Sequence, residues 1–258
     1  MSSGFTRVAL VTGAAQGMGL AIALRLAEDG LDVAVNDITS KSEALQQAVS
    51  QIEAKGRRAV AVSGDISSEA DVKAMVDRAV DALGGLDVMV ANAGIAVMAG
   101  LLETTVEDWD RIFSINARGA MLCYKYAALQ MIKQGRGGRI IGASSTSGKL
   151  ASINLCAYSA AKSVVRSLTQ AAAQELQPYN ITVNAYAPGL VNTPMVQHPD
   201  DVKNGGPVST ATKTFGLPEG TKVMDPGVIA NLVSYLVHPK TDFMTGQTIA
   251  VDSGRTMD

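Results

Sequence analysis

Short apolar runs rich in β-branched residues alternate with helical patterns along almost the whole chain of 258 residues. Runs that are apolar at every position, rather than at every second one, indicate strands buried on both faces of a parallel sheet. Alternation of this kind predicts a single doubly wound α/β sheet of about seven strands, with helices on both faces. The expected strands are residues 8–11, 33–35, 59–62, 86–90, 139–142, 181–185 and 248–251. The clearest helical patterns are residues 21–27, 72–83, 109–131 and 163–176.

One segment, residues 192–226, interrupts this alternation. It is rich in Pro, Gly, Thr, Ser and Lys, has little periodicity, and follows the sixth expected strand. Ligands of open α/β sheets bind beyond the carboxyl ends of the strands. We therefore expect one catalytic domain over residues 1–258 with a substrate lid at about 192–226, the alternative being a disordered surface insertion.

The balance of charge excludes several kinds of partner. The formal net charge is −2, which opposes binding to nucleic acid or to an anionic membrane surface.

Two cysteines far apart and two histidines give no zinc-binding pattern, so no metal is expected. We find no run long and apolar enough to span a membrane and no secretory signal pattern, and we expect a cytoplasmic protein with reduced thiols.

A glycine-rich turn joins the first expected strand to the first helix. It contains Gly13, Gln16, Gly17, Met18 and Gly19. Glycines at such a turn let the backbone approach a pyrophosphate, whose charge then lies at the helix N-terminus. The turn indicates a dinucleotide site because a strand precedes it, a helix follows it, and the second strand ends in an acid.

That acid is Asp37, whose carboxylate can bind both ribose hydroxyls of an adenosine. A 2′-phosphate beside it would be repelled, and neither Gln16 nor Ile38 supplies a cation to hold one. The sequence therefore predicts NAD(H) rather than NADP(H).

Tyr158 and Lys162 have the spacing that places two side chains on one face of a helix. A free phenol has a pKa near ~10. A positive charge nearby favours the phenolate and lowers that pKa toward the range useful in general acid–base catalysis. The pair alone is common by chance, so its meaning depends on the other motifs.

Taken in order, the motifs of the chain resemble those of the short-chain dehydrogenase/reductase family, which has a Rossmann fold. The matching positions are Thr12 to Gly19 (TGAAQGMG), Asp65, Asn92-Ala-Gly94, Asn116, Ser145, Tyr158 with Lys162, Pro188-Gly189 with Thr193, and Val251-Asp-Ser-Gly254. Two positions depart from the family pattern, since Ala91 and Ser253 stand where Asn and Gly are more usual.

The resemblance implies a role for each catalytic residue. Tyr158 exchanges a proton with the substrate oxygen while hydride moves to or from the nicotinamide, and Lys162 binds the nicotinamide ribose and lowers the phenol pKa. Ser145 donates a hydrogen bond to the reacting oxygen, and Asn116 helps to hold a water that links Lys162 to solvent.

The resemblance also implies the cofactor contacts and a homotetramer. Contacts to NAD are expected from Gly13, Gln16, Gly17, Met18, Gly19, Asp37, Ile38, Asp65, Ile66, Asn92, Ala93, Gly94, Tyr158, Lys162, Pro188, Gly189, Val191 and Thr193. Asp65 and Ile66 correspond to adenine contacts, and Val191 and Thr193 to contacts with the carboxamide.

Within the family, the chain is most similar to acetoin/diacetyl reductases and 2,3-butanediol dehydrogenases. The similar stretches are residues 17–30, 56–62 and 242–247. This favours an acyloin, a diketone or a vicinal diol as the small-molecule substrate. Candidate substrate contacts are Ser145, Met98, Asn154, Met195 and Phe215.

Three alternatives remain. The substrate could be a larger secondary metabolite, such as a terpenoid or polyketide alcohol, or a 3-oxoacyl thioester, which Asp37 opposes because that group mostly uses NADPH. A protein that only binds dinucleotide would lack Ser145, Tyr158 or Lys162, and this chain has all three.

Overall fold

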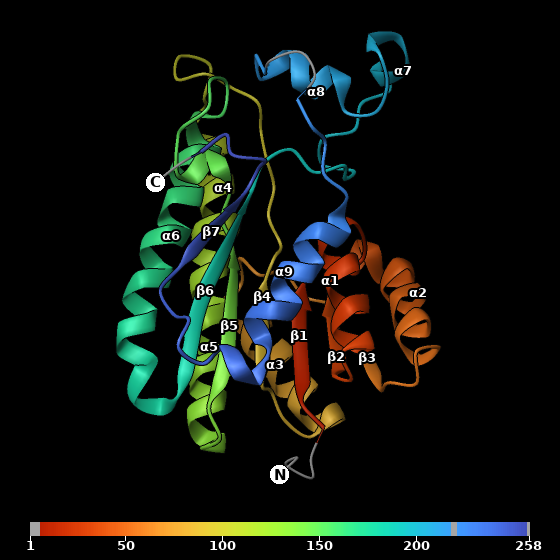
Figure 1. The fold of residues 1–258 in the computed structure, drawn as a ribbon, viewed down its shortest axis with the longest axis vertical. Coiled ribbons are helices and arrows are strands. Elements are labelled where there is room, and N and C mark those ends of the chain that lie inside the picture. The colour runs from red at the N-terminus through yellow and green to blue at the C-terminus, as the bar shows by residue number, and fades with distance from the viewer. Residues whose placement is uncertain (1–5, 218–220, 257–258) are drawn as a thin grey trace.

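A seven-stranded sheet, parallel throughout, forms the centre of the computed structural model, which describes residues 6–217 and 221–256 (Figure 1). The strand order is β3-β2-β1-β4-β5-β6-β7. The strands are β1 (Val8–Thr12), β2 (Asp32–Asn36), β3 (Ala59–Ala61), β4 (Val88–Ala91), β5 (Gly138–Ala143), β6 (Ile181–Pro188) and β7 (Thr248–Val251). The order reverses between β1 and β4, which opens a crevice at the carboxyl ends of these strands. The predicted fold class is confirmed.

Helices cover both faces of this sheet (Figure 1). One face packs against α1 (Gly17–Glu28), α2 (Ser42–Glu53) and α9 (Pro226–Val237). The other packs against α3 (Glu69–Leu83), α5 (Ala120–Gln134) and α6 (Cys156–Leu176). Short 3-10 turns complete the connections: η1 (Thr39–Lys41), η3 (Thr146–Gly148), η4 (Gln177–Tyr179) and η5 (Pro239–Thr241).

Strand β1 shows why these strands are apolar at every position. Ala9 and Val11 belong to the core under α1 and α9, whereas Val8 and Leu10 belong to the core under α3 and α5. All four are at most 1% exposed. Each buried Val or Leu side chain contributes about 1.5–3 kcal/mol to folding, so both cores depend on the same strand.

The helix expected over residues 109–131 is not one regular helix. It consists of α4 (Val106–Ile112), a π-helical segment η2 (Phe113–Gly119), and α5. The helical periodicity of the apolar residues continues across both boundaries, so the sequence carries no sign of the wider turn. Asn116 lies inside η2, which agrees with the tendency of π-segments to occur at functional sites.

The β6–α9 segment, residues 192–226, lies beyond the carboxyl edge of the sheet, at the top of Figure 1. It contains two short helices that the sequence did not indicate, α7 (Asp201–Asn204) and α8 (Ser209–Thr214). Residues 218–220 of this segment lie outside the described residues. Helix α9 begins with the Asp225 carboxylate accepting a hydrogen bond from the Gly227 amide at 2.7 Å and with Pro226 in the first turn, a favourable start for a helix.

Among the described residues, no helix combines the length and apolar character needed to cross a membrane.

Candidate active site

The glycine-rich turn between β1 and α1 has the geometry of a phosphate-binding cradle. Gly13 has φ +64°, and a Cβ on Gly19 would collide with the Gly13 carbonyl oxygen. No side chain caps the N-terminus of α1, and its first turn has no acidic residue. The amides and the positive end of the helix dipole are therefore available to an anion, and these residues fit the pyrophosphate of a dinucleotide.

Asp37 lies beside this turn, directly after β2. Its Oδ2 accepts a hydrogen bond from the Ala15 amide at 3.2 Å and its Oδ1 one from the Ile38 amide at 2.9 Å. These bonds fix the carboxylate next to the cradle, where it can receive hydroxyl donors. A basic group that the sequence did not reveal also lies here, since the Lys41 Nζ is 3.5 Å from the Gln16 Oε1.

Asn92 has a structural role that its motif did not predict. Its Nδ2 donates to the Thr12 carbonyl at 2.8 Å, and its Oδ1 accepts from the Tyr186 hydroxyl at 2.8 Å. The Thr12 hydroxyl in turn accepts from the Asn92 and Ala93 amides, each at 3.0 Å. The Asn92 side chain thus joins the ends of β1, β4 and β6.

The expected adenine contacts follow β3. The exposed Asp65 donates its amide to the Asp71 Oδ2 at 2.9 Å, and its own carboxylate accepts from the Ser67 amide at 2.8 Å. Ile66 is buried, and its side chain lies against Gly119. Both contacts remain predictions.

Ser145, Tyr158 and Lys162 come together at the carboxyl edge of β5. Ser145 follows that strand, and its Oγ accepts from the Ser147 amide at 3.1 Å. Ser145 and Tyr158 line the same cavity, and Ser145 is close enough to affect the pKa of Tyr158. The Lys162 Nζ lies 5.6 Å from the centre of the Tyr158 ring and donates to the Ala143 carbonyl at 2.8 Å.

Burial governs the protonation of this group. It raises the pKa of Tyr158 above its usual value, and the hydrogen bond from Ser145 acts in the opposite direction. Burial also lowers the pKa of Lys162 to about 8. The lowering of the Tyr158 pKa expected from Lys162 is not seen in the protein alone, where the Ser145 contact is the one that lowers it.

Asn116 is buried, and its side-chain amide is hydrogen-bonded to the amide and the carbonyl of Ile95. Its Oδ1 accepts from the Ile95 amide at 2.9 Å, and its Nδ2 donates to the Ile95 carbonyl at 2.8 Å. A Cβ added to Gly94 would lie 3.0 Å from the Asn116 Oδ1 and 3.2 Å from the Lys162 Nζ. Gly94 therefore lets Asn116 and Lys162 approach the same point.

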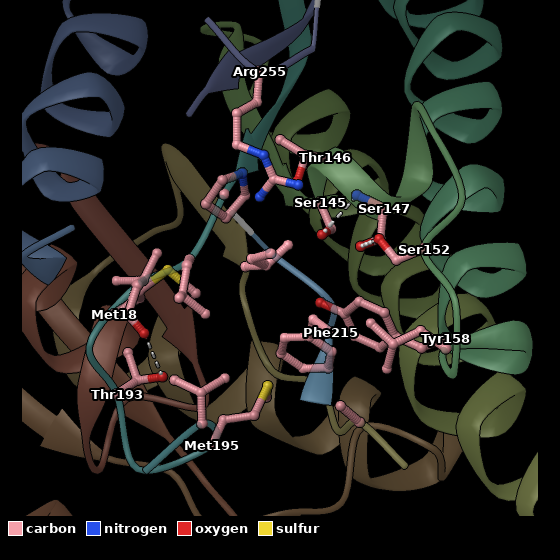
Figure 2. A pocket seen from close by; sticks show the side chains of 18 residues that line it. Met18, Ser145, Thr146, Ser147, Ser152, Tyr158, Thr193, Met195, Phe215 and Arg255 are labelled. Atoms are coloured by element: carbon pink, nitrogen blue, oxygen red, sulfur yellow. Dashed lines mark hydrogen bonds between the residues drawn. The ribbon is translucent and has the colours of Figure 1, made fainter. Parts of the chain in front are cut away.

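A cavity of about 110 Å³ opens beside these groups (Figure 2). It is lined by Met18, Ala96, Ser145, Thr146, Ser147, Ser152, Leu155, Tyr158, Pro188, Gly189, Leu190, Val191, Thr193, Met195, Val196, Phe215, Leu217 and Arg255. Its wall thus includes the expected nicotinamide-side residues from Pro188 to Thr193.

Of the expected substrate contacts, Ser145, Met195 and Phe215 line this cavity, whereas Met98 and Asn154 do not. Met98 is 52% exposed on the loop after β4. The Asn154 side chain instead donates to the Thr214 carbonyl at 3.5 Å. Arg255 was not predicted from the sequence, because it follows the last strand and reaches the cavity only through a reversal of the chain.

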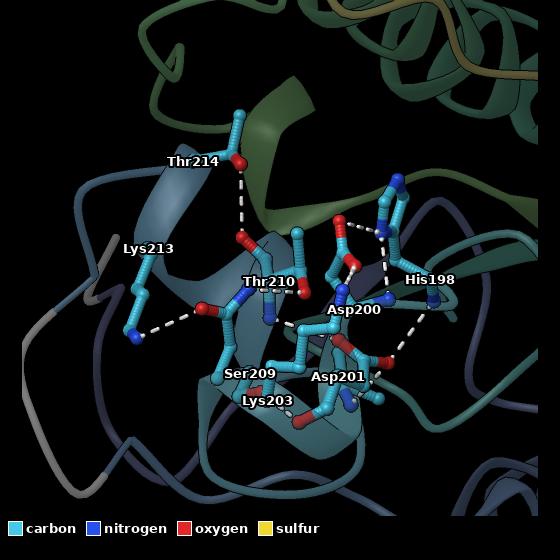
Figure 3. A network of polar contacts seen from close by, with 10 residues as sticks. His198, Asp200, Asp201, Lys203, Ser209, Thr210, Lys213 and Thr214 are labelled. Carbon is cyan, nitrogen blue, oxygen red and sulfur yellow. Dashed lines mark hydrogen bonds and ion pairs between the residues drawn. The ribbon is translucent and has the colours of Figure 1, made fainter.

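The buried Asp201 carboxylate organises the β6–α9 segment (Figure 3). It accepts from the amides of His198 at 3.0 Å, Val208 at 2.9 Å and Thr210 at 2.9 Å. These hydrogen bonds hold the pKa of Asp201 well below its usual range. Val208 has φ +64°, a strained value for a β-branched residue, and its side chain is fully buried beside Leu190.

Comparison with known proteins identifies the family. The model of the family described as short chain dehydrogenase matches residues 7–203. A short-chain dehydrogenase/reductase of Armillaria gallica is 48% identical, covering 98% of this chain and 97% of its own. The L-2,3-butanediol dehydrogenase of Corynebacterium glutamicum is 40% identical, covering 96% of this chain and 98% of its own.

A solved structure has the same fold. The short chain dehydrogenase from Mycobacterium paratuberculosis bound to NAD has a TM-score of 0.86 to this chain at 34% sequence identity. The match covers 96% of this chain and 97% of that one.

Proposed function

The chain belongs to the short chain dehydrogenase family, and we propose that it transfers hydride between a nicotinamide dinucleotide and a secondary alcohol or ketone. One observation carries this proposal. Ser145 and Tyr158 lie in the wall of one cavity, and Lys162 lies beside the Tyr158 ring. A phosphate-binding turn lies on the other side of that cavity, where Met18 contributes to the wall.

Ser145 and Tyr158 bind the reacting oxygen of the substrate. In reduction the Tyr158 hydroxyl donates its proton to that oxygen, and in oxidation the same oxygen of Tyr158 accepts it. The Ser145 hydroxyl donates a hydrogen bond to the charge that develops there. The nicotinamide, when bound, supplies or accepts the hydride.

Lys162 supplies positive charge behind Tyr158. Its bond to the Ala143 carbonyl fixes the ammonium at the end of β5, where the Nζ lies close to Gly94. The remaining N–H groups of the ammonium can bind a ribose hydroxyl. Asn116 lies inside the π-helical segment η2, and we assign it to holding a water through which Lys162 exchanges protons with solvent.

NAD(H) is the proposed cofactor because Asp37 lies beside the phosphate cradle. Its carboxylate can accept hydrogen bonds from both hydroxyls of the adenosine ribose and would repel a 2′-phosphate. Lys41 is the one nearby cation in the described residues of this turn and η1 that could oppose this preference.

An acyloin, a diketone or a vicinal diol is the proposed substrate. Support comes from the 40% identity to the L-2,3-butanediol dehydrogenase. A larger secondary metabolite is the second candidate, because the β6–α9 segment adds the apolar Met195, Phe215 and Leu217 to the cavity wall.

We assign the β6–α9 segment as a substrate lid, since its residues line the cavity. A homotetramer is proposed from the family resemblance, and exposed apolar side chains on α5 and α6, such as Leu129 and Val164, are consistent with association. The two free cysteines, Cys123 and Cys156, agree with a cytoplasmic location.

A substrate panel tests this function. Nicotinamide absorbance is followed with butane-2,3-dione, 3-hydroxybutan-2-one, a bulky terpenoid ketone and a 3-oxoacyl thioester, each with NADH and with NADPH. We expect turnover of the small diketone and acyloin with a higher kcat/KM for NADH. Asp37→Asn should reduce that preference, because it removes the negative charge beside the ribose. Higher kcat/KM with NADPH in the unmodified protein would contradict the assignment of Asp37.

A further inference from the structure

The chain reverses direction immediately after β7. Asp252 organises this reversal: its Oδ1 accepts from the Gly254 amide at 3.0 Å and the Arg255 amide at 3.2 Å. Its Oδ2 accepts from the amide and the hydroxyl of Thr256, both at 2.7 Å. One carboxylate therefore fixes residues 252–256, which we call the C-terminal hook.

The hook has a strained backbone. Ser253 has φ +60° and Gly254 has φ +82°, both in the left-handed region. Glycine adopts this region freely and serine does so only at a cost, which explains why glycine is more usual at position 253 in the family. A strained backbone conformation persists where surrounding contacts hold it in place, and here the four hydrogen bonds to the Asp252 carboxylate hold residues 253 and 254 in theirs.

The hook carries Arg255 to the cavity. In Figure 2 the Arg255 side chain points from the end of β7 toward the side of the cavity where Ser145 and Thr146 lie. Asp252 packs against Gly189, which also lines the cavity, and this contact keeps the hook over its rim.

Arg255 is the one charged side chain among the residues that line the cavity. The other polar groups in the wall are hydroxyls, and the wall opposite includes Met195 and Phe215. Within residues 6–217 and 221–256, the Arg255 guanidinium takes part in no ion pair and no hydrogen bond to a side chain or carbonyl. Its five N–H donors are therefore available to a ligand.

We propose that Arg255 selects substrates that carry a second acceptor oxygen, beyond the oxygen that reacts at Tyr158. Neutral hydroxyl or carbonyl oxygens and carboxylates share this chemistry, and a guanidinium binds carboxylates through paired hydrogen bonds. The inference rests on the proposed function and deepens it: Ser145 and Tyr158 hold the reacting oxygen, and the hook binds another part of the same molecule.

Three ketones of four carbons test the proposal. Butan-2-one has only the reacting oxygen, 3-hydroxybutan-2-one adds a neutral oxygen, and 3-oxobutanoate adds a carboxylate. We expect Arg255→Ala to lower kcat/KM by about ten-fold or more for at least one of the two substrates with a second oxygen, mainly through KM. Its kcat/KM for butan-2-one should stay unchanged, and Arg255→Lys should retain part of the selectivity.

Lys240→Ala is the matched control, because it removes an exposed cation from η5, away from the cavity-lining residues. The shift in melting temperature that each ketone causes in the presence of NADH is measured for the same variants, so the comparison does not depend on turnover. Equal effects of Arg255→Ala on all three ketones, in turnover and in melting shift, would overturn the role of Arg255. Absence of turnover with a selective, Arg255-dependent melting shift would instead count against the proposed reaction and support the binding role.

Discussion

At the scale of single residues, the site buries a phenol and an ammonium, and burial shifts their pKa values in opposite directions. Burial raises the pKa of Tyr158, which keeps the phenol in its acid form, ready to donate a proton. The same burial lowers the pKa of Lys162 to about 8, which makes its positive charge costly to hold. The hydrogen bond to the Ala143 carbonyl offsets part of that cost.

Replacing Lys162 should therefore stabilise the protein without its cofactor. The folded pKa of about 8 lies below the usual value of 10.5 for a lysine, so the charged lysine destabilises the fold fully below pH 8. The penalty is lost as the pH rises toward 10.5, because the folded state then no longer binds the proton. We expect Lys162→Met to raise the free energy of unfolding at pH 7 by roughly 2 kcal/mol, after the lost hydrogen bond is subtracted.

Urea unfolding at pH 7 and at pH 9.5 measures this difference. The gain should shrink at the higher pH, and Lys133→Met, which replaces an exposed lysine on α5, should show no such dependence. A loss of stability of equal size at both values of pH would contradict burial of a charged Lys162.

At the scale of elements, the sequence predicted those strands and helices that are determined by the local pattern of apolar residues. The central strands were recognisable because each is buried, and therefore apolar, on both faces. The π-segment η2 was missed because a wider turn leaves the apolar periodicity intact. Helices α7 and α8 were missed because they depend on Asp201, whose three amide donors come from residues on both sides of it.

Asp201 should control binding of the substrate rather than of the cofactor. Asp201→Ala leaves three amide donors without their acceptor and releases the strained Val208, so the β6–α9 segment should lose its packing against Leu190. We expect KM for the ketone to rise by about ten-fold, with NADH affinity unchanged. Steady-state kinetics and NADH fluorescence titration measure the two effects.

Asp200→Ala is the matched control for this variant. It removes the neighbouring, half-exposed carboxylate, which pairs with the side chains of His198 and Lys203. Equal KM values for the two variants would show that the Asp201 network does not position the β6–α9 segment for substrate binding.

At the scale of the whole molecule, the point where the strand order reverses determines where the chemistry takes place. Strands β1, β4, β5 and β6 end around one crevice and deliver the phosphate cradle, Asn92, Ser145 and the Pro188–Thr193 region to it. The order of motifs along the sequence was enough to predict this arrangement. Two features could not be predicted from the sequence. The hydrogen bonds of the Asn92 side chain form only when β1, β4 and β6 lie side by side. Arg255 reaches the cavity only because the C-terminal hook reverses the chain.

The central claim is that Tyr158 is the acid–base group of a nicotinamide-dependent oxidoreductase. The most direct test compares NADH oxidation by a ketone substrate in the unmodified protein, in Tyr158→Phe, and in Tyr179→Phe, which alters an exposed tyrosine. We predict that Tyr158→Phe lowers kcat by about 10²–10⁴-fold while NADH binding, followed by fluorescence, is retained. Tyr179→Phe should leave both unchanged, and a kcat in Tyr158→Phe equal to that of the unmodified protein would contradict the account.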